Sequence, residues 1–371
     1  MDDASNMQII QQKSYFGTFT SKDGLLYGVR VANEDDVQKI MDLYYEIYGS
    51  EYTDSIVYDF NSLKESINSD TDYFWFVGEL INNTDVELFG SGLVKKVDNL
   101  TLDAAKAVIK KKFQNQGLGF ELGTKAILTA LNLPKFNGTI RLTGEARAFN
   151  RHSQSVLENS GAFPIAFSPI FGNYGNRKGV IINQDLPFCE GYAEPAVYYI
   201  KPLNGFWKKR EHGIFLLNND DILFMYEQIK KNRKCKQWMK SDTLSIGSDS
   251  QLQWQNIKIQ TKPDIGAVFV QGYLHRVYLK HLLYKYSKWR YLEWKIPTSE
   301  RGLNSMELAL KENFVINGYD PGSLYTLDGK LVDCVIFSHL FKEIEYPIDR
   351  IQVMPKAEPI VDRVLNMLKR K

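Results

Sequence analysis

The chain has 371 residues, of which 44% are hydrophobic and 24% are charged, and its formal net charge is +2. This length favours two domains, and the ordinary globular composition argues against a disordered or fibrous protein. The nearly balanced charge gives no overall electrostatic footprint for nucleic acid.

Strands and amphipathic helices alternate in the first part of the chain. Asn33 offers an N-cap oxygen, and apolar residues recur at helical spacing as far as Tyr48, which predicts a helix between them. The other elements predicted here are a strand at 25–31, a short helix around 63–67, and strands at 73–77 and 86–94 joined by a turn at 82–85.

A polar, glycine-containing segment, Gln114-Asn-Gln-Gly-Leu-Gly119, then stands between an apolar stretch and a helical pattern. The stretch 104–109 predicts a strand, and apolar residues from Leu118 to Thr129 lie on one helical face. A further strand at 139–146 and a helix at 150–159 follow. We expect short strands joined by loops over 163–183, and a connecting region where prolines punctuate 187–202.

The second half of the chain repeats this order of elements in outline, without a repeat at the level of residues. Its predicted helices lie at 220–231, 273–288, 305–313 and 357–371, and its predicted strands at 254–260, 265–270, 291–296 and 330–337. We therefore expect an α/β (α+β) protein of two domains, residues 1–190 and 191–371, each with a mixed central β-sheet flanked by helices.

The turn at Gln114–Gly119 carries the most chemical information. The N-terminus of a helix leaves backbone N–H groups unpaired and carries a positive partial charge. Glycines let the backbone approach a ligand closely, so such a turn is suited to a pyrophosphate. The basic run Lys110–Lys112 just before it would add positive charge.

Two neighbouring motifs do not fit this segment. No GxxxxGK[ST] string occurs, and Leu122 stands where a GxGxxG fingerprint needs its third glycine. On the glycines alone, a plain strand-to-helix turn remains an alternative to a phosphate site.

Two segments together resemble the GNAT acyltransferase superfamily. Gln114-Asn-Gln-Gly-Leu-Gly119 is similar to its Q/R-x-x-G-x-G/A phosphate loop. Asn150-Arg-His-Ser-Gln-Ser-Val-Leu-Glu-Asn-Ser-Gly-Ala-Phe163 looks like its second cofactor motif, in which an Asn opens a helix that ends at a glycine. The resemblance spans roughly residues 25–185, and it implies a GNAT fold that binds acetyl-coenzyme A or another acyl-coenzyme A, with no metal.

The resemblance also implies roles for individual residues. The backbone from Gln116 through Leu118 to Gly119 would hold the pyrophosphate, with Gln114 and Asn115 in the same loop. The strand edge at Ile109 and Lys111 would pair with the pantetheine amides. Asn150 and Ser153 would lie beside the pantetheine arm and the thiol.

One position departs from the family pattern. Many members carry on the last helix a Tyr that protonates the leaving thiolate, and the matching position here is Leu157. The candidates for a replacement acid are His152 and, second, Tyr174. His152 could equally be a histidine that bonds locally at the start of its helix.

An amine acceptor requires a general base. Glu145, at the end of the strand before the second motif, is our first candidate, and Glu79 is the second. A solvated carboxylate at a strand end is an equal alternative for Glu145. A strand N–H at or near Ile109 would meet the acyl oxyanion.

The C-terminal half, residues 191–371, is similar to a degenerate GNAT-like domain. Segments 310–321 and 329–336 look like the closing corner and last strands of the superfamily, but this half has no Q/R-x-x-G-x-G loop. We expect it not to bind coenzyme A. Four tryptophans either line a cleft or pack in its core: Trp238, Trp254, Trp289 and Trp294.

Other residue types narrow the class of protein. The 3 cysteines are far apart and the 5 histidines lack metal-ligand spacing, so neither a disulfide framework nor a metal site is expected. The polar start of the chain and the lack of a long apolar run favour a cytoplasmic protein without a membrane partner.

These observations predict an N-acyltransferase, with acetyl as the expected group, acting on a small-molecule amine or a peptide by a direct ternary-complex mechanism. One alternative is a non-catalytic regulatory protein that binds acyl-coenzyme A. Another is acylation of a peptide or RNA amine with the basic segment 230–240 as a docking surface, although the balanced total charge argues against nucleic acid.

Overall fold

The computed structural model describes residues 14–21, 23–50, 52, 54–81, 86–174, 192–247, 257–326, 329–342 and 350–370. The chain forms two compact units. The first holds Met1–Glu145 and His152–Ala162, and the second holds Ala146–Arg151 and Phe163–Lys371. A domain boundary between residues 190 and 191 stays a prediction, since both residues lie outside the described ranges.

A mixed β-sheet forms the centre of the first unit. Its strands pair in chain order: β1 (Gly17–Thr20), β2 (Leu26–Val31), β3 (Tyr73–Ile81), β4 (Val86–Lys96), β5 (Thr101–Ile109) and β6 (Arg141–Arg147). All neighbours are antiparallel except β5 and β6, which are parallel. Helix α4 (Leu118–Ala130) supplies the crossover that parallel neighbours need.

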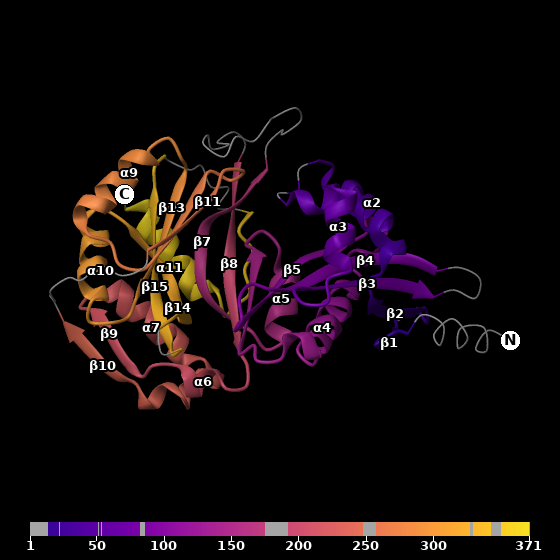
Figure 1. Ribbon diagram of the computed structural model, residues 1–371, viewed down its shortest axis with the longest axis horizontal. Helices are drawn as coiled ribbons and strands as arrows, with labels where there is room; N and C mark the ends of the chain where they lie inside the picture. The colour runs from indigo at the N-terminus through magenta and orange to yellow at the C-terminus, as the bar shows by residue number, and fades with distance from the viewer. Residues whose placement is uncertain are drawn as a thin grey trace. The chain divides into compact units, whose positions relative to one another are not determined.

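Helices cover both faces of this sheet (Figure 1). Helices α2 (Val37–Tyr48) and α3 (Phe60–Ile67) lie on one face, and α4 and α5 (Arg151–Asn159) lie on the other. Buried side chains of α2 and α3 pack with Trp75, Val77 and Leu93 of the strands. Because strand side chains alternate between faces, Phe74 and Phe76 belong to the opposite layer.

The predicted start of the first long helix is confirmed. Asn33 accepts the N–H of Asp35 at 3.1 Å, and its own N–H donates to the Asp36 carboxylate at 2.9 Å. This reciprocal cap opens a short 3-10 turn that leads directly into α2.

The second unit contains a longer mixed sheet and a small separate one. The main strands lie in the order β8 (Tyr192–Pro202), β7 (Phe163–Tyr174), β14 (Val315–Tyr325), β15 (Leu331–Leu340), β13 (Tyr291–Pro297), β12 (Ala267–Gln271) and β11 (Lys258–Lys262). Strands β9 (Gly213–Leu217) and β10 (Thr243–Gly247) form a parallel pair of their own.

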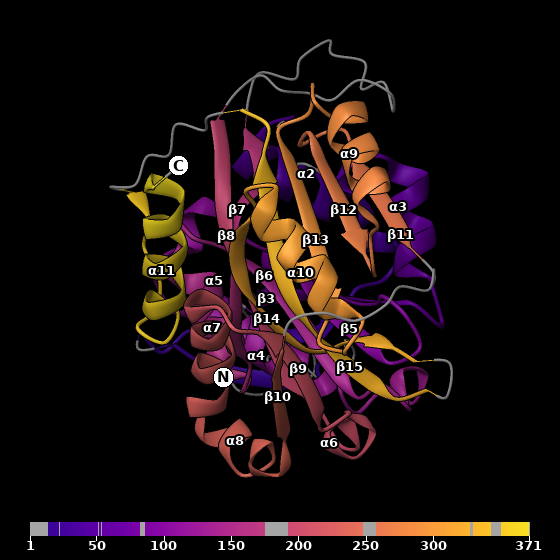
Figure 2. The same ribbon diagram turned by 90° about the vertical axis from the view of Figure 1, so that its left-hand side faces the viewer.

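Helices also flank the sheet of the second unit (Figure 2). They are α6 (Phe206–Lys209), α7 (Asp220–Lys231), α8 (Arg233–Lys236), α9 (Arg276–Lys285), α10 (Gly302–Lys311) and α11 (Glu358–Lys369). Helices α7 and α11 pack on β14, and α10 packs on β13 and β9. The predicted α/β class, with mixed sheets flanked by helices, is confirmed.

Most predicted elements of the second half are present with shifted ends. The helices predicted at 220–231, 273–288, 305–313 and 357–371 are α7, α9, α10 and α11, and three of the predicted strands are β12, β13 and β15. The strand expected at 254–260 begins at Lys258, and residues 254–256 lie outside the described ranges, as does the turn at 82–85.

The expected connecting region before the second half is wrong for its described part. Residues 192–202 form β8, whose apolar residues from Ala196 to Ile200 are buried. Pro195 is tolerated within the strand, and its carbonyl accepts the N–H of Ala148 at 2.8 Å. Short strands were expected over 163–183, but residues 163–174 form one strand, β7, and residues 175–183 lie outside the described ranges. The register between β7 and β8 shifts near the prolines and the glycine of β7.

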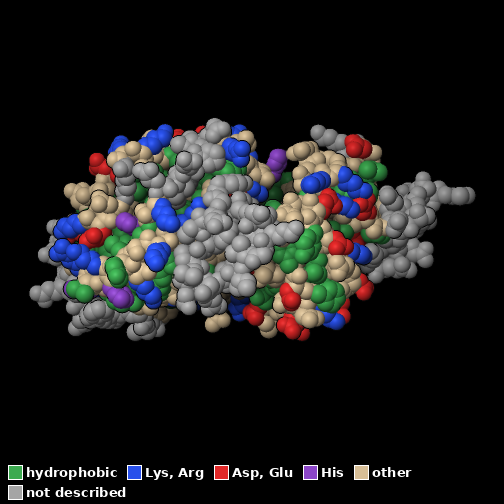
Figure 3. Space-filling view, turned by 90° about the horizontal axis from the view of Figure 1, so that it is seen from above, with side chains coloured by type: hydrophobic (Ala, Val, Ile, Leu, Met, Phe, Trp, Pro, Cys, Tyr) green, Lys and Arg blue, Asp and Glu red, His purple; other side chains and the backbone are tan. Residues whose placement is uncertain are grey.

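The face of the molecule drawn in Figure 3 shows Lys and Arg side chains interspersed with Asp and Glu, as the net charge of +2 leads one to expect. No described helix combines the length and the apolar character that crossing a membrane requires.

Candidate functional site

The first turn of α4 presents unpaired backbone donors. Its N-cap, Gly117, has a φ of 79° and no side chain caps the helix. Within the described residues, the N–H groups of residues 115–119 have no hydrogen-bond acceptor. A row of free N–H groups at a helix N-terminus is a ready site for an anion such as a phosphate.

The local sequence dictates this turn. Asn115 has a φ of 61°, in the left-handed region that Asn tolerates better than most residues, and Gly117 lies in the same region. The side-chain amide of Gln114 donates to the carbonyl of Ile109 at 2.9 Å, and that of Gln116 donates to the carbonyl of Lys112 at 2.9 Å. The two glutamines therefore fix the loop onto the end of β5, while its backbone N–H groups stay available.

The basic run before the turn is partly neutralised. Lys110 and Lys112 both bind the carboxylate of Glu87, at 2.8 Å and 2.5 Å. Burial would raise the pKa of Glu87, but these two ammonium groups outweigh it and hold that pKa below its ordinary value. Lys111 is exposed and has no ion pair with a described residue, while its backbone N–H donates to Glu46 at 3.0 Å.

Strands β5 and β6 diverge beside this turn. Their parallel pairing covers Thr101–Ala104 and Arg141–Gly144. Lys106, two residues beyond that stretch, has a φ of 58°, and the register between β4 and β5 shifts there. This bulge bends the strand away from its parallel neighbour and leaves the half of β5 that ends at Ile109 unpaired with β6.

An ion pair between a buried lysine and a half-exposed aspartate lies at the bulge. The ammonium group of Lys106 pairs with Asp54 and lies 5.6 Å from the centre of the Tyr52 ring, and the Tyr44 hydroxyl donates to the Lys106 carbonyl at 2.5 Å. Burial lowers the pKa of Lys106. The opposing effects of burial and of the Lys106 charge leave the pKa of Asp54 below its ordinary value.

The sequence interpretation missed this pair. An apolar strand pattern does not indicate that Lys106 has a left-handed backbone conformation, and Asp54 lies far from Lys106 in the sequence. Glu46 and Glu87 were also missed, because their proximity to the basic run depends on tertiary structure.

The candidate catalytic residues lie on β6 and α5. Glu145 is exposed and directly follows Gly144, the last residue of β6 that pairs with β5. His152 is exposed and Ser153 is half-buried in the first turn of α5, and Asn150 is exposed just before that helix.

Close packing places α5 against α4 and β6. A Cβ atom built on Gly123 of α4 would lie 2.6 Å from Val156. One built on Gly144 of β6 would lie 2.7 Å from Leu157. Leu157 is thus a core residue, 6% exposed, and the helix turns this position toward the strand and away from solvent.

The second base candidate, Glu79, is part of a buried triad of charged residues with Arg30 and Asp36. Arg30 donates to Glu79 at 2.6 Å and 3.0 Å and to Asp36 at 2.6 Å and 2.8 Å, and the Tyr15 hydroxyl donates to Glu79 at 2.6 Å. Burial alone would lower the pKa of Arg30, but the two carboxylates raise it. Glu79 therefore has a structural role here.

Tyr174 ends β7, and its side chain lies outside those described. Among the described residues, no group of three or more His, Cys, Asp and Glu side chains is placed to hold a metal ion.

In the described part of the second unit, the helix that follows β12 has a capped first turn. The parallel pair β12 and β13 stays in register along the whole of β12. The first turn of the following helix, α9, is capped by His275, whose Nδ1 accepts the N–H of Val277 at 3.4 Å. Of the four tryptophans, Trp289 and Trp294 are core residues, Trp238 is 46% exposed, and Trp254 lies outside the described ranges.

Solved structures of GNAT acetyltransferases match about half of this chain. A spermidine N-acetyltransferase from Vibrio cholerae, solved with CoA and spermine, is 14% identical with a TM-score of 0.36, over 47% of this chain and 95% of that chain. An acetyltransferase of the GNAT family from Streptococcus pneumoniae is 15% identical with a TM-score of 0.35, over 48% and 99%. NAA60 of Arabidopsis thaliana, solved with a bisubstrate analogue, is 10% identical with a TM-score of 0.36, over 48% and 99%.

No protein-family model matches the sequence, and no curated protein matches it.

Proposed function

We propose that this protein is an acyl-coenzyme A-dependent N-acyltransferase whose donor site lies in the first unit. The observation that carries the proposal is the row of free N–H groups at residues 115–119, next to the half of β5 that ends at Ile109. A pyrophosphate needs several converging donors, and an extended amide-bearing chain needs an open strand edge. Coenzyme A carries both a pyrophosphate and an amide-bearing chain.

The donor would be held mainly by backbone. Residues 115–119 would bind the pyrophosphate. Lys111 would add positive charge there, because Lys110 and Lys112 are paired with Glu87. The strand edge at Ile109 and Lys111 would face the pantetheine arm. For this, the Gln114 amide must release the Ile109 carbonyl, and Glu46 must release the Lys111 N–H.

The acyl-coenzyme A supplies an activated thioester, and the protein supplies orientation and proton transfer. Glu145 takes a proton from the acceptor ammonium, so that a neutral amine can attack. His152 gives a proton to the departing thiolate, with Asn150 and Ser153 beside it. Preorganised strand donors near Ile109 meet the charge that develops on the acyl oxygen.

Release of free thiol from acetyl-coenzyme A, with a polyamine, an amino acid and a short peptide as acceptors, tests this function. Replacing Glu145→Gln should lower kcat by about 100-fold or more, because the base is removed. The control Glu121→Gln changes an exposed carboxylate on α4 that pairs with Lys125, and it should leave kcat unchanged. Equal rates for the two variants would remove Glu145 from the mechanism.

One observation favours a second candidate function, the sensing of acyl-coenzyme A without turnover. The position that carries a catalytic Tyr in many GNAT members is here the core residue Leu157. Tight acetyl-coenzyme A binding with no thiol release for any acceptor would support it.

A further inference from the structure

We propose that the second unit binds single-stranded RNA on a surface built from two stacked tryptophans and the exposed lysines around them. We call it the tryptophan–lysine surface, and it consists of Trp207, Lys208, Lys209, Lys236, Trp238 and Lys240. This inference is independent of the proposed acyl transfer, since it concerns other residues and another ligand.

The two indoles form a platform. The rings of Trp207 on α6 and Trp238, which follows α8, are parallel within 5°, with centroids 6.3 Å apart. Arg210 covers Trp207 at 5.6 Å from its ring centre. Trp238 is 46% exposed, so part of its ring is open to solvent. A flat ring with one face covered and the rest open is suited to stacking a nucleobase.

The exposed charged side chains of this surface are all lysines. Lys208, Lys209, Lys236 and Lys240 are exposed, and none has an ion pair with a described residue. Residues 228–240 contain no Asp or Glu, nor do residues 203–210. Because the whole chain is nearly neutral, this is a local concentration of positive charge of the kind that contacts phosphates.

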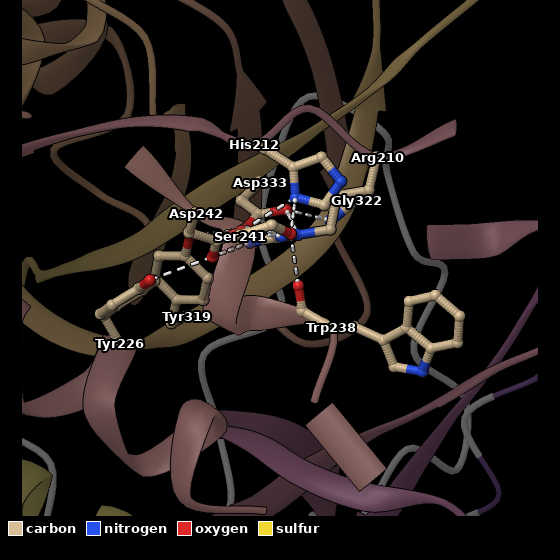
Figure 4. A network of polar contacts seen from close by, with 9 residues as sticks. All are labelled: Arg210, His212, Tyr226, Trp238, Ser241, Asp242, Tyr319, Gly322 and Asp333. Atoms are coloured by element: carbon tan, nitrogen blue, oxygen red, sulfur yellow. Dashed lines mark hydrogen bonds and ion pairs between the residues drawn. The ribbon is translucent and has the colours of Figure 1, made fainter. Parts of the chain in front are cut away.

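A buried network holds the two halves of the surface together (Figure 4). Arg210, directly after α6, donates to Asp242 at 2.8 Å and to Asp333 at 2.5 Å, and all three side chains are fully buried. The Tyr226 hydroxyl donates to Asp242 at 3.0 Å, and that of Tyr319 donates to Asp333 at 2.5 Å.

The network fixes α6 relative to the segment from Trp238 to Asp242. The indole of Trp238 points away from the network in Figure 4 and is 46% exposed. Opposing effects of burial and of Arg210 leave the pKa of Asp242 below its ordinary value, so the carboxylate stays ionised and the support persists at neutral pH. Preorganisation of this kind reduces the entropy that a ligand must lose on binding.

The geometry favours a nucleic acid strand over a lipid surface. The two indoles lie parallel within 5° with their centroids 6.3 Å apart, an offset arrangement that leaves ring face open for a stacked base. A single strand offers a partner to each kind of side chain on this surface, bases to the ring and phosphates to the ammonium groups. Unpaired bases are needed for stacking, so a single strand fits better than a duplex.

The test measures the affinity of the full chain for a fluorescent oligouridylate by anisotropy, between about 50 mM and 200 mM salt. With four phosphate contacts, the logarithm of the affinity should fall with the logarithm of salt with a slope of about −3. Trp238→Ala should weaken binding about 5- to 150-fold with the slope unchanged, because stacking is lost and the charges remain. Trp238→Phe should restore part of the affinity.

The charge contribution has a matched control. Lys236→Glu/Lys240→Glu should nearly abolish binding, whereas Lys280→Glu/Lys285→Glu on α9 makes the same charge change at exposed lysines elsewhere in this unit and should have little effect. Equal losses in the two double variants would overturn the proposal, as would no binding by wild type at low salt. Binding of anionic phosphatidylglycerol vesicles in place of RNA, lost in Trp238→Ala, would also overturn it. Circular dichroism must show that every variant is folded.

Discussion

Glu79 and Glu145 have the same side chain, yet their surroundings give them opposite roles. Glu79 is 1% exposed and shares Arg30 with Asp36. Glu145 is exposed at the point where β6 leaves β5. The lone pairs of the first carboxylate are committed to a buried guanidinium, whereas a substrate can reach the second. Burial therefore separates the structural carboxylate from the proposed base.

This contrast predicts different responses to one chemical change. Glu79→Gln should lower the free energy of unfolding by about 1.5–3 kcal/mol, because it weakens the charge-assisted hydrogen bonds that Glu79 accepts from Arg30 in the core. Glu145→Gln should change it by no more than about 0.5 kcal/mol. Urea denaturation followed by circular dichroism measures both. A Glu79→Gln variant as stable as wild type would show that the triad contributes nothing.

At the scale of elements, α5 is fixed by small residues that let it approach its neighbours. Gly144 on β6 and Gly123 on α4 leave no room for a Cβ beside Leu157 and Val156. The helix rotation that this packing requires turns position 157 into the core. Packing thus directs the side chain at position 157 into the core.

Introducing a Tyr at position 157 should therefore destabilise the protein. Leu157→Tyr should lower the free energy of unfolding by about 1–3 kcal/mol through overpacking, and it should not raise the rate of thiol release. Asn159→Tyr, at an exposed position of the same helix, is the control and should be near neutral. A stable Leu157→Tyr variant with faster thiol release would contradict this account of α5.

The sequence predicts an element well when neighbouring residues determine it, and poorly when contacts with distant residues determine it. The cap at Asn33, the helix α4 and the turn before it follow from neighbouring residues, so periodicity and glycine placement found them. Strand β8 was missed, because proline signals outweighed an apolar run whose burial only the tertiary structure reveals. The bulge at Lys106 was missed for the same reason, since no local signal marks a left-handed Lys.

The candidate site follows the same rule. Residues 114–119 are contiguous, so one motif indicated the whole turn. The neutralisation of Lys110 and Lys112 by Glu87 could not be foreseen, because it joins β4 to a loop beyond β5. The roles assigned to Ile109, Lys111, Asn150, His152 and Ser153 stay proposals.

At the scale of the whole molecule, the two units share an order of strands and helices but differ in what they leave open. The first leaves the start of α4 uncapped and lets β5 and β6 diverge, whereas the second caps α9 with His275 and keeps β12 paired with β13. We infer that donor binding is confined to the first unit, and that the second contributes the tryptophan–lysine surface.

The most direct test of the central claim is calorimetric titration of acetyl-coenzyme A into wild type, Gly117→Asp and Gly117→Asn. The backbone at Gly117 has a left-handed conformation, and a Cβ atom built there lies more than 4 Å from every described residue except the two adjacent ones. Asp and Asn tolerate this conformation, so both variants should fold. The two side chains have nearly the same size and differ mainly in charge. We expect wild type to bind, and Gly117→Asp to bind at least about 10-fold more weakly than Gly117→Asn, since its carboxylate repels the pyrophosphate. No binding by wild type, or equal affinity of the two variants, would contradict a coenzyme A site at the start of α4.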